Sequence, residues 1–149
     1  MSIVVRAPVA GDEPGWRLLW AGYNRFYRAA VPEPVTVALW SKLLVGGAWA
    51  GFVASQDGAL VGLAHTLLHE SSWSLQPSCY LEDLFVAREA RGGDVGQALI
   101  EAAGAAARAR GADRLYWHTQ EFNGAARSLY DTLAERTSFI MYRVGLDKG

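Results

Sequence analysis

The chain has 149 residues, enough for one well-buried core and too few for two ordinary domains. Apolar residues make up 51% of it and charged residues 19%, a balance that excludes a disordered chain. The formal net charge of −1 gives no electrostatic reason to expect nucleic acid or an anionic membrane as a partner.

The single cysteine, Cys79, excludes an intrachain disulfide and suits a reducing compartment. The N-terminal apolar run is soon interrupted by charge, so it resembles neither a signal peptide nor a membrane span, and no other apolar run reaches membrane length. We therefore expect a soluble cytoplasmic protein.

The first elements are a strand and a helix. Residues 2–8 are rich in β-branched side chains, which is typical of a short strand. From Asp12 to Tyr27, aromatic and aliphatic residues recur at helical intervals, and Asp12 or Glu13 suits the N-cap or the positive end of the helix dipole.

A second helix and a hairpin follow. Pro32 and Pro34 end the first helix, and residues 35–45 resume a helical pattern. Residues 48–55 and 59–70 read as strands on either side of a Gln-Asp-Gly turn, which favours a hairpin.

The remaining elements alternate between strands and helices. Strands are predicted over 79–86, 113–119 and 138–146, and helices over 95–110 and 123–136, with Gly111 ending the first helix and Asn123 capping the second. The order predicts a single mixed α/β domain spanning residues 1–149.

A glycine-rich loop precedes the 95–110 helix. Gly92, Gly93 and Gly96 would let an anion approach the exposed N–H groups of the helix start, and Arg91 adds a cation. The glycines alone are equally compatible with a simple turn. The predicted buried stripe of the helix consists mostly of small residues: Val95, Ala98, Leu99, Ala102, Ala106 and Ala109.

Two nucleotide-binding patterns are absent from this loop. It lacks the G-x-G-x-x-G spacing of dinucleotide-binding folds, and no Lys followed by Ser or Thr completes a phosphate-binding loop. The remaining candidate ligand for this loop is a diphosphate group that belongs to another kind of molecule.

Four segments in this order resemble the GNAT superfamily of acetyl-CoA-dependent N-acetyltransferases: YLEDLFV at 80–86, RGGDVG at 91–96, LYWHT at 115–119 and NGAARSLY at 123–130. Within it, YLEDLFV and the closing FIMYRV at 139–144 look like the branch that holds spermidine/spermine and yeast histone and D-amino acid acetyltransferases. The resemblance implies an α/β (α+β) fold with a central mixed, mostly antiparallel sheet flanked by helices. It also implies acetyl-CoA as co-substrate and no metal.

The same resemblance implies the cofactor site. Its loop pattern assigns the pyrophosphate to Arg91, Gly92, Gly93, Asp94, Val95 and Gly96, and the pantetheine arm to backbone groups of Phe85 and Val86 and to Asn123, with Ala126 and Tyr130 beside them. Asp94 departs from the pattern, which has glycine there. Because a carboxylate would repel a pyrophosphate, we expect its side chain to point into solvent.

Acetyl transfer needs a base for the amine and a proton for the departing thiolate. Strand alternation puts Tyr80, Glu82, Leu84 and Val86 on one face and Leu81, Asp83 and Phe85 on the other, so one carboxylate should face the acceptor. Glu82, acting through a water, is the first choice as base and Asp83 the second. Alternatively, both pair with Arg or Lys at the strand end.

Tyr130 matches the superfamily's general-acid tyrosine, although a core tyrosine with its hydroxyl at the surface is the alternative. Candidate acceptor-site residues are Tyr23, Tyr27, His69, Tyr80 and Glu82. The histidines lack metal-ligand spacing, and Cys79 has no obvious base beside it.

The predicted function is transfer of an acetyl group to the primary amine of a small molecule, a polyamine or amino acid-like, by direct attack in a ternary complex. Three alternatives stay open: a non-catalytic acyl-CoA sensor, a protein lysine acetyltransferase and a dimeric structural protein. Residues 138–146 suggest an edge strand through which a homodimer would form.

Overall fold

The computed structural model describes residues 2–120 and 123–146. The chain forms two compact units, residues 1–118 and residues 119–149. Among the described residues, all strands and the helices that cover them lie in the first unit, and the second contains one helix and the segment after it.

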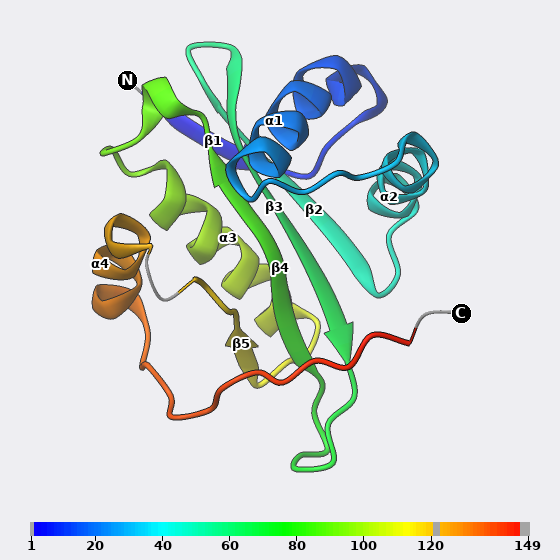
Figure 1. Cartoon of the computed structure of the whole chain (residues 1–149), viewed down its shortest axis with the longest axis vertical. Helices are drawn as coiled ribbons and strands as arrows, with labels where there is room; N and C mark the ends of the chain where they lie inside the picture. The colour runs from blue at the N-terminus through cyan, green and yellow to red at the C-terminus, as the bar shows by residue number, and fades with distance from the viewer. Residues whose placement is uncertain (1, 121–122, 147–149) are drawn as a thin grey trace. The chain divides into compact units, whose positions relative to one another are not determined.

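A five-stranded sheet in the order β1-β2-β3-β4-β5 forms the first unit (Figure 1). Neighbouring strands are antiparallel except β4 and β5, which are parallel. The strand bounds are β1 Ile3–Arg6, β2 Trp49–Gln56, β3 Ala59–His69, β4 Ser78–Val86 and β5 Arg114–Tyr116. This confirms the mixed, mostly antiparallel sheet, although β5 is shorter than predicted.

The predicted hairpin is β2–β3. Its turn residues Asp57 and Gly58 both have positive φ, 53° and 83°, as a tight two-residue hairpin requires. A short apolar strand on each side then pairs across the turn, so local sequence was enough to predict this element.

Two helices, α1 (Glu13–Phe26) and α2 (Glu33–Val45), cover one face of the sheet. The core between them and the sheet consists of Trp16, Leu19, Trp20, Leu39, Trp40, Leu43, Val53 and Leu63. The second helix begins earlier than predicted because proline is tolerated in the first turn, where its missing N–H would have no helical partner.

At the start of α1, Glu13 lies in the first turn, where an acidic residue was expected to favour the helix dipole. Asp12 makes no capping bond to the helix. Its carboxylate accepts the Val9 backbone N–H at 2.8 Å and pairs with Arg6 at 2.7 Å, so it closes the 3-10 turn η1 (Ala10–Asp12) instead.

The third helix, α3 (Val95–Ala109), packs on the opposite face. A Cβ atom added at Gly62 on β3 would lie 3.0 Å from both Leu99 and Val95, so helix and strand are in close contact. The predicted stripe was partly wrong: the buried residues are Val95, Leu99, Ile100, Ala103 and Ala107. This helix carries alanines on every side, so its apolar pattern did not identify the face that is buried.

The predicted assignment of β4 side chains to the two faces of the sheet was partly wrong, because the strand contains a β-bulge. His65 pairs with Asp83 but Thr66 pairs with Leu81, which leaves Glu82 as the extra residue. Paired residues share a face, and Tyr80 pairs with Leu67, two positions from His65. Tyr80 therefore lies on the same face as Asp83, and not opposite it as simple alternation predicted.

The second unit contains α4 (Gly124–Leu133). Asn123 occupies its N-cap position without a side-chain capping bond. The predicted strand over 138–146 was wrong, since these residues form no strand in the described part of the chain. A β-rich composition favours extended backbone, but a strand also needs a partner for its hydrogen bonds.

Candidate active site

The edge of β4 that faces β5 is open over most of its length. The two strands pair only at Ser78, Cys79 and Tyr80, and no described residue pairs with the following stretch of β4 on that side (Figure 1). This edge offers backbone N–H and C=O groups to an extended ligand that carries amides. Phe85 and Val86, the predicted pantetheine residues, lie on this stretch.

The glycine loop beyond β4 has an accessible backbone. Gly92 has a φ of 85°, a conformation that favours glycine, and a Cβ placed there would meet no atom within 4 Å. At Gly93 the nearest atom would be the Ala90 carbonyl oxygen at 3.7 Å. The loop therefore has room for an anion next to its N–H groups.

Asp94 precedes α3 directly. It is exposed, and its side chain makes no hydrogen bond to the helix start. The exposed position agrees with the expectation that this carboxylate points into solvent, where screening weakens its repulsion of a phosphate.

Arg91 is held against the end of β4. Its Nε donates to the Val86 carbonyl at 2.9 Å, and its guanidinium lies 5.3 Å from the Phe85 ring centroid and 5.7 Å from that of Phe26. The side chain is therefore ordered by strand and aromatic contacts.

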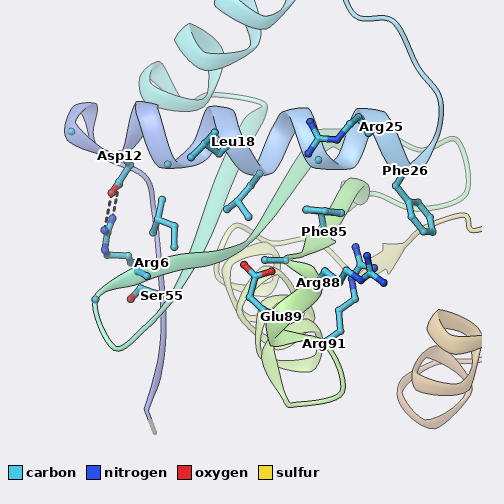
Figure 2. Close-up of a pocket in the computed structure, with 18 residues that line it drawn as sticks. Arg6, Asp12, Leu18, Arg25, Phe26, Ser55, Phe85, Arg88, Glu89 and Arg91 are labelled. Carbon is cyan, nitrogen blue, oxygen red and sulfur yellow. Dashed lines mark hydrogen bonds and ion pairs between the residues drawn. The ribbon is translucent and has the colours of Figure 1, made fainter.

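A groove of about 1040 Å³ runs beside α1. Figure 2 shows Arg25, Arg88 and Arg91 at one end and the Arg6–Asp12 pair at the other. Of the predicted cofactor residues it includes Phe85 and Arg91, and it includes none of the predicted acceptor residues. The predicted acceptor site is therefore a different surface.

Asp83 sits at the end of a buried chain of hydrogen bonds. Its Oδ2 lies 2.9 Å from Nδ1 of His65, and the other ring nitrogen, Nε2, accepts the Trp16 indole N–H at 3.0 Å. His65 is 0% exposed. Tyr23 on α1 lies close to Asp83; burial first, and then the negative charge of Asp83, raise the pKa of the Tyr23 hydroxyl.

Glu82, the extra residue of the bulge, lies next to Asp83 on β4. Partial loss of water around its carboxyl group raises its pKa, and the negative charge of Asp83 raises it further. Neither carboxylate forms an ion pair with Lys or Arg within the residues that the structure describes. The alternative of two strand-end ion pairs is thus not what the structure shows.

A group of tyrosines and histidines extends from Glu82 across β4 and β5. Tyr80 lies close to Glu82, and burial together with the negative charge of Glu82 raises the pKa of Tyr80 to about 12. The Tyr80 hydroxyl also lies 3.2 Å from Nδ1 of His118. On the other side, Nε2 of His69 lies 2.6 Å from the Tyr116 hydroxyl, and the Tyr80 and Tyr116 ring centroids are 4.9 Å apart.

The predicted acceptor residues thus form two neighbouring groups. Tyr23 on α1 lies beside Asp83, and its ring centroid is 4.9 Å from that of Tyr27, the residue that follows α1. Tyr80 lies beside Glu82 and is connected to His69 through Tyr116.

Sequence analysis missed three residues of this site: His65, Tyr116 and His118. For His65 a signal existed, because a histidine within the apolar run Leu63 to Leu68 must find polar partners when buried.

Three predicted residues belong to the second unit. Ala126 and Tyr130 lie four positions apart on α4, hence on one face of that helix. The Asn123 side-chain amide lies 3.5 Å from Thr119 Oγ1.

Within residues 2–120 and 123–146, no cluster of three or more His, Cys, Asp or Glu could hold a metal ion. No helix in these ranges is long and apolar enough to span a bilayer.

Residues 16–134 match the Acetyltransferase (GNAT) family. The D-amino-acid N-acetyltransferase HPA3 of Saccharomyces cerevisiae is 32% identical over 146 residues, covering 95% of this chain and 89% of the yeast protein. The N-acetyltransferase YhfO of Bacillus subtilis is 30% identical over 140 residues, covering 93% and 94%. Among solved structures, AAC(6')-Iy in complex with the bisubstrate analog CoA-S-monomethyl-acetylneamine superposes with a TM-score of 0.83 at 21% identity, covering 97% and 99%.

Proposed function

Because the chain belongs to the acetyltransferase (GNAT) family and is an acetyl-CoA-dependent N-acetyltransferase, we propose that its acceptor is the primary amine of a small polyamine or amino acid-like molecule. The amine attacks directly within a ternary complex, and residues 1–149 act as one catalytic domain. The observation that carries this proposal is the pair Glu82 and Asp83 next to the open edge of β4.

The electrostatics of the site support a cationic acceptor. Two adjacent carboxylates without a Lys or Arg partner, in the described part of the chain, attract an ammonium ion. The rings of Tyr23, Tyr27 and Tyr80 add faces that favour cations.

Glu82 is the proposed base. An ammonium ion must lose its proton before it attacks, and a carboxyl group whose pKa is raised accepts a proton more readily near neutral pH. Tyr80 lies close to the Glu82 carboxylate, and an intervening water carries the proton from the amine. The mechanism uses no metal ion.

The cofactor residues are proposed on the sequence pattern together with the accessible loop. Acetyl-CoA supplies the thioester. The N–H groups around Arg91 to Gly96 would hold its pyrophosphate, the backbone of Phe85 and Val86 its pantetheine arm, with Asn123 and Ala126 alongside. Tyr130 would give its proton to the departing thiolate.

The names of two similar proteins support a small acceptor. The yeast relative is named for D-amino acids, and the solved structure holds the bisubstrate analog CoA-S-monomethyl-acetylneamine. Both acceptors are small amines. We also propose that the enzyme acts in the cytoplasm as a homodimer.

The test is thiol release from acetyl-CoA with a panel of polyamines, D-amino acids, lysine analogues, aminoglycosides and basic peptides. Turnover of a small amine is the expected result. Tight acetyl-CoA binding without turnover on any amine would support a sensor, and preference for the peptides would support a protein acetyltransferase. Absence of a thermal shift at saturating acetyl-CoA would support a structural protein.

A further inference from the structure

His65 is a buried polar residue that the proposed chemistry has not used. It lies on β3 with no exposed surface, between the rings of Trp16 and Trp20 at centroid distances of 5.8 Å and 5.4 Å. Both of its ring nitrogens have a partner. A fully satisfied histidine in an apolar core requires an explanation, because a leucine would fill similar space without polar partners.

The two partners define the tautomer. An indole N–H can only donate, so Nε2 of His65 accepts from Trp16 and carries no proton. The ring proton is therefore on Nδ1, where it donates to Oδ2 of Asp83.

The chain of bonds holds Asp83 from one side. His65 fixes Oδ2 from the core, and Tyr23 lies close to the same carboxylate from α1. Asp83 lies on β4 one residue from the bulged Glu82, and its side chain is 12% exposed. A carboxylate held in this way keeps a fixed position for an incoming ammonium group.

We infer that His65, locked as the Nδ1–H tautomer by Trp16, is a positioning residue that orients Asp83 to bind the acceptor's ammonium group while Glu82 serves as the base. This inference rests on the proposed function. It assigns different roles to two adjacent carboxylates that the sequence offered as alternatives for one role.

Two substitutions at His65 separate its two hydrogen bonds. The amide nitrogen of Asn reaches the Nδ1 position, so His65→Asn keeps a donor to Asp83 and loses the acceptor for Trp16. The longer His65→Gln reaches the Nε2 position, so it keeps the acceptor for Trp16 and loses the donor to Asp83. Both replace an aromatic ring by an amide in the same buried site.

The expected result is a difference between the two variants in KM for the amine. With the fastest amine of the panel, His65→Gln should raise this KM by about tenfold or more, the scale of one hydrogen bond to a charged group, with KM for acetyl-CoA within about twofold. His65→Asn should stay within about threefold of the wild type. Equal effects of both variants, or an equal rise in KM for acetyl-CoA, would overturn the inference.

A double-mutant cycle tests whether His65 acts through Asp83. Because Asp83→Asn already removes the charge that His65 orients, His65→Gln should add little to the amine KM of an Asp83→Asn enzyme. Effects that multiply in the double variant would contradict action through Asp83.

Nitrogen-15 NMR of the histidine rings in the wild-type protein gives a readout that does not depend on turnover. An Nδ1–H tautomer at neutral pH is expected for His65. An Nε2–H tautomer or an imidazolium would overturn the inference even if the variants unfold. If no amine is turned over, the proposed function fails, whereas the tautomer still tests the geometry of this chain of hydrogen bonds.

Discussion

At the scale of single residues, Glu82 and Asp83 show where sequence reasoning ends. The dipeptide predicted two carboxylates near the acceptor, and both lie in the described site. Their relation to Tyr80 was predicted wrongly, because alternation assumes a regular strand and the bulge at Glu82 shifts the register by one. The local sequence LEDL does not indicate a bulge, because the position of the extra residue depends on how β4 pairs with β3.

Glu82→Gln is the first prediction, and it concerns the base. We expect kcat to fall by about 10²–10⁴-fold, the usual contribution of a general base. In the wild type the acidic limb of kcat/KM should lie above the pH range of an ordinary glutamate, because the pKa of Glu82 is raised, and this limb should be lost in the variant. Steady-state kinetics from pH 5 to 9 with Glu101→Gln, an exposed α3 carboxylate, as control provides the test.

The second prediction concerns the effect of Glu82→Gln on the stability of the fold, which should not fall although the activity does. A raised pKa means that folding favours the protonated form of Glu82, so at pH above the folded-state pKa the charged group lowers the free energy of unfolding. Glu82→Gln should therefore unfold at no lower temperature than the wild type at neutral pH. The advantage should disappear as the pH falls below the pKa of an unfolded glutamate. A destabilised variant with an unchanged pH profile would argue against Glu82 as the base.

At the scale of elements, prediction succeeded where local signals agree. The β2–β3 hairpin has a turn sequence that requires positive φ, and α3 follows a glycine-rich loop. Prediction failed for residues 138–146, which are rich in residues that favour strands but pair with no strand in the described chain. It failed in part for the stripe of α3, because alanine is apolar on every face. Long-range pairing and packing decide these cases, and neither is encoded locally.

The contact between α3 and β3 gives a prediction about two glycines. A Cβ at Gly62 would lie 3.0 Å from Leu99 and Val95 and 3.2 Å from the Phe85 carbonyl oxygen, so Gly62→Ala must move the helix that follows the glycine loop. We expect a loss of about 1–3 kcal/mol in the free energy of unfolding, as for overpacked cores, and weaker acetyl-CoA binding.

Gly104→Ala is the matched control on the same helix. Its added Cβ would meet only Leu115 Cδ2 at an ordinary 3.7 Å, and alanine favours helix by about 1 kcal/mol over glycine. It should stabilise the protein and leave acetyl-CoA affinity unchanged. Urea denaturation and calorimetry measure both quantities, and a Gly62→Ala enzyme with wild-type stability would contradict the tight contact.

At the scale of the whole molecule, the C-terminal segment bears on the proposed homodimer. Ile140, Met141, Tyr142, Val144 and Leu146 are 67–90% exposed, although such a run of apolar side chains is unusual on the surface of a monomer. The sequence predicted an edge strand here; what remains after the correction is an exposed apolar segment whose side chains would lose water in an association between copies. The dimer hypothesis therefore does not need the strand.

Ile140→Asp should convert such a dimer into a monomer, because a buried charge without a partner at an interface costs several kcal/mol. Leu75→Asp is the control, since Leu75 is an equally apolar residue that is 102% exposed in the loop before β4. Sedimentation equilibrium at micromolar concentration should give a dimer for the wild type and for Leu75→Asp, and a monomer with wild-type circular dichroism for Ile140→Asp. A monomeric wild type would remove the dimer from the proposed function while leaving the acetyltransferase site unaffected, because the carboxylates, the open edge of β4 and the glycine loop all lie within residues 1–118 of one chain.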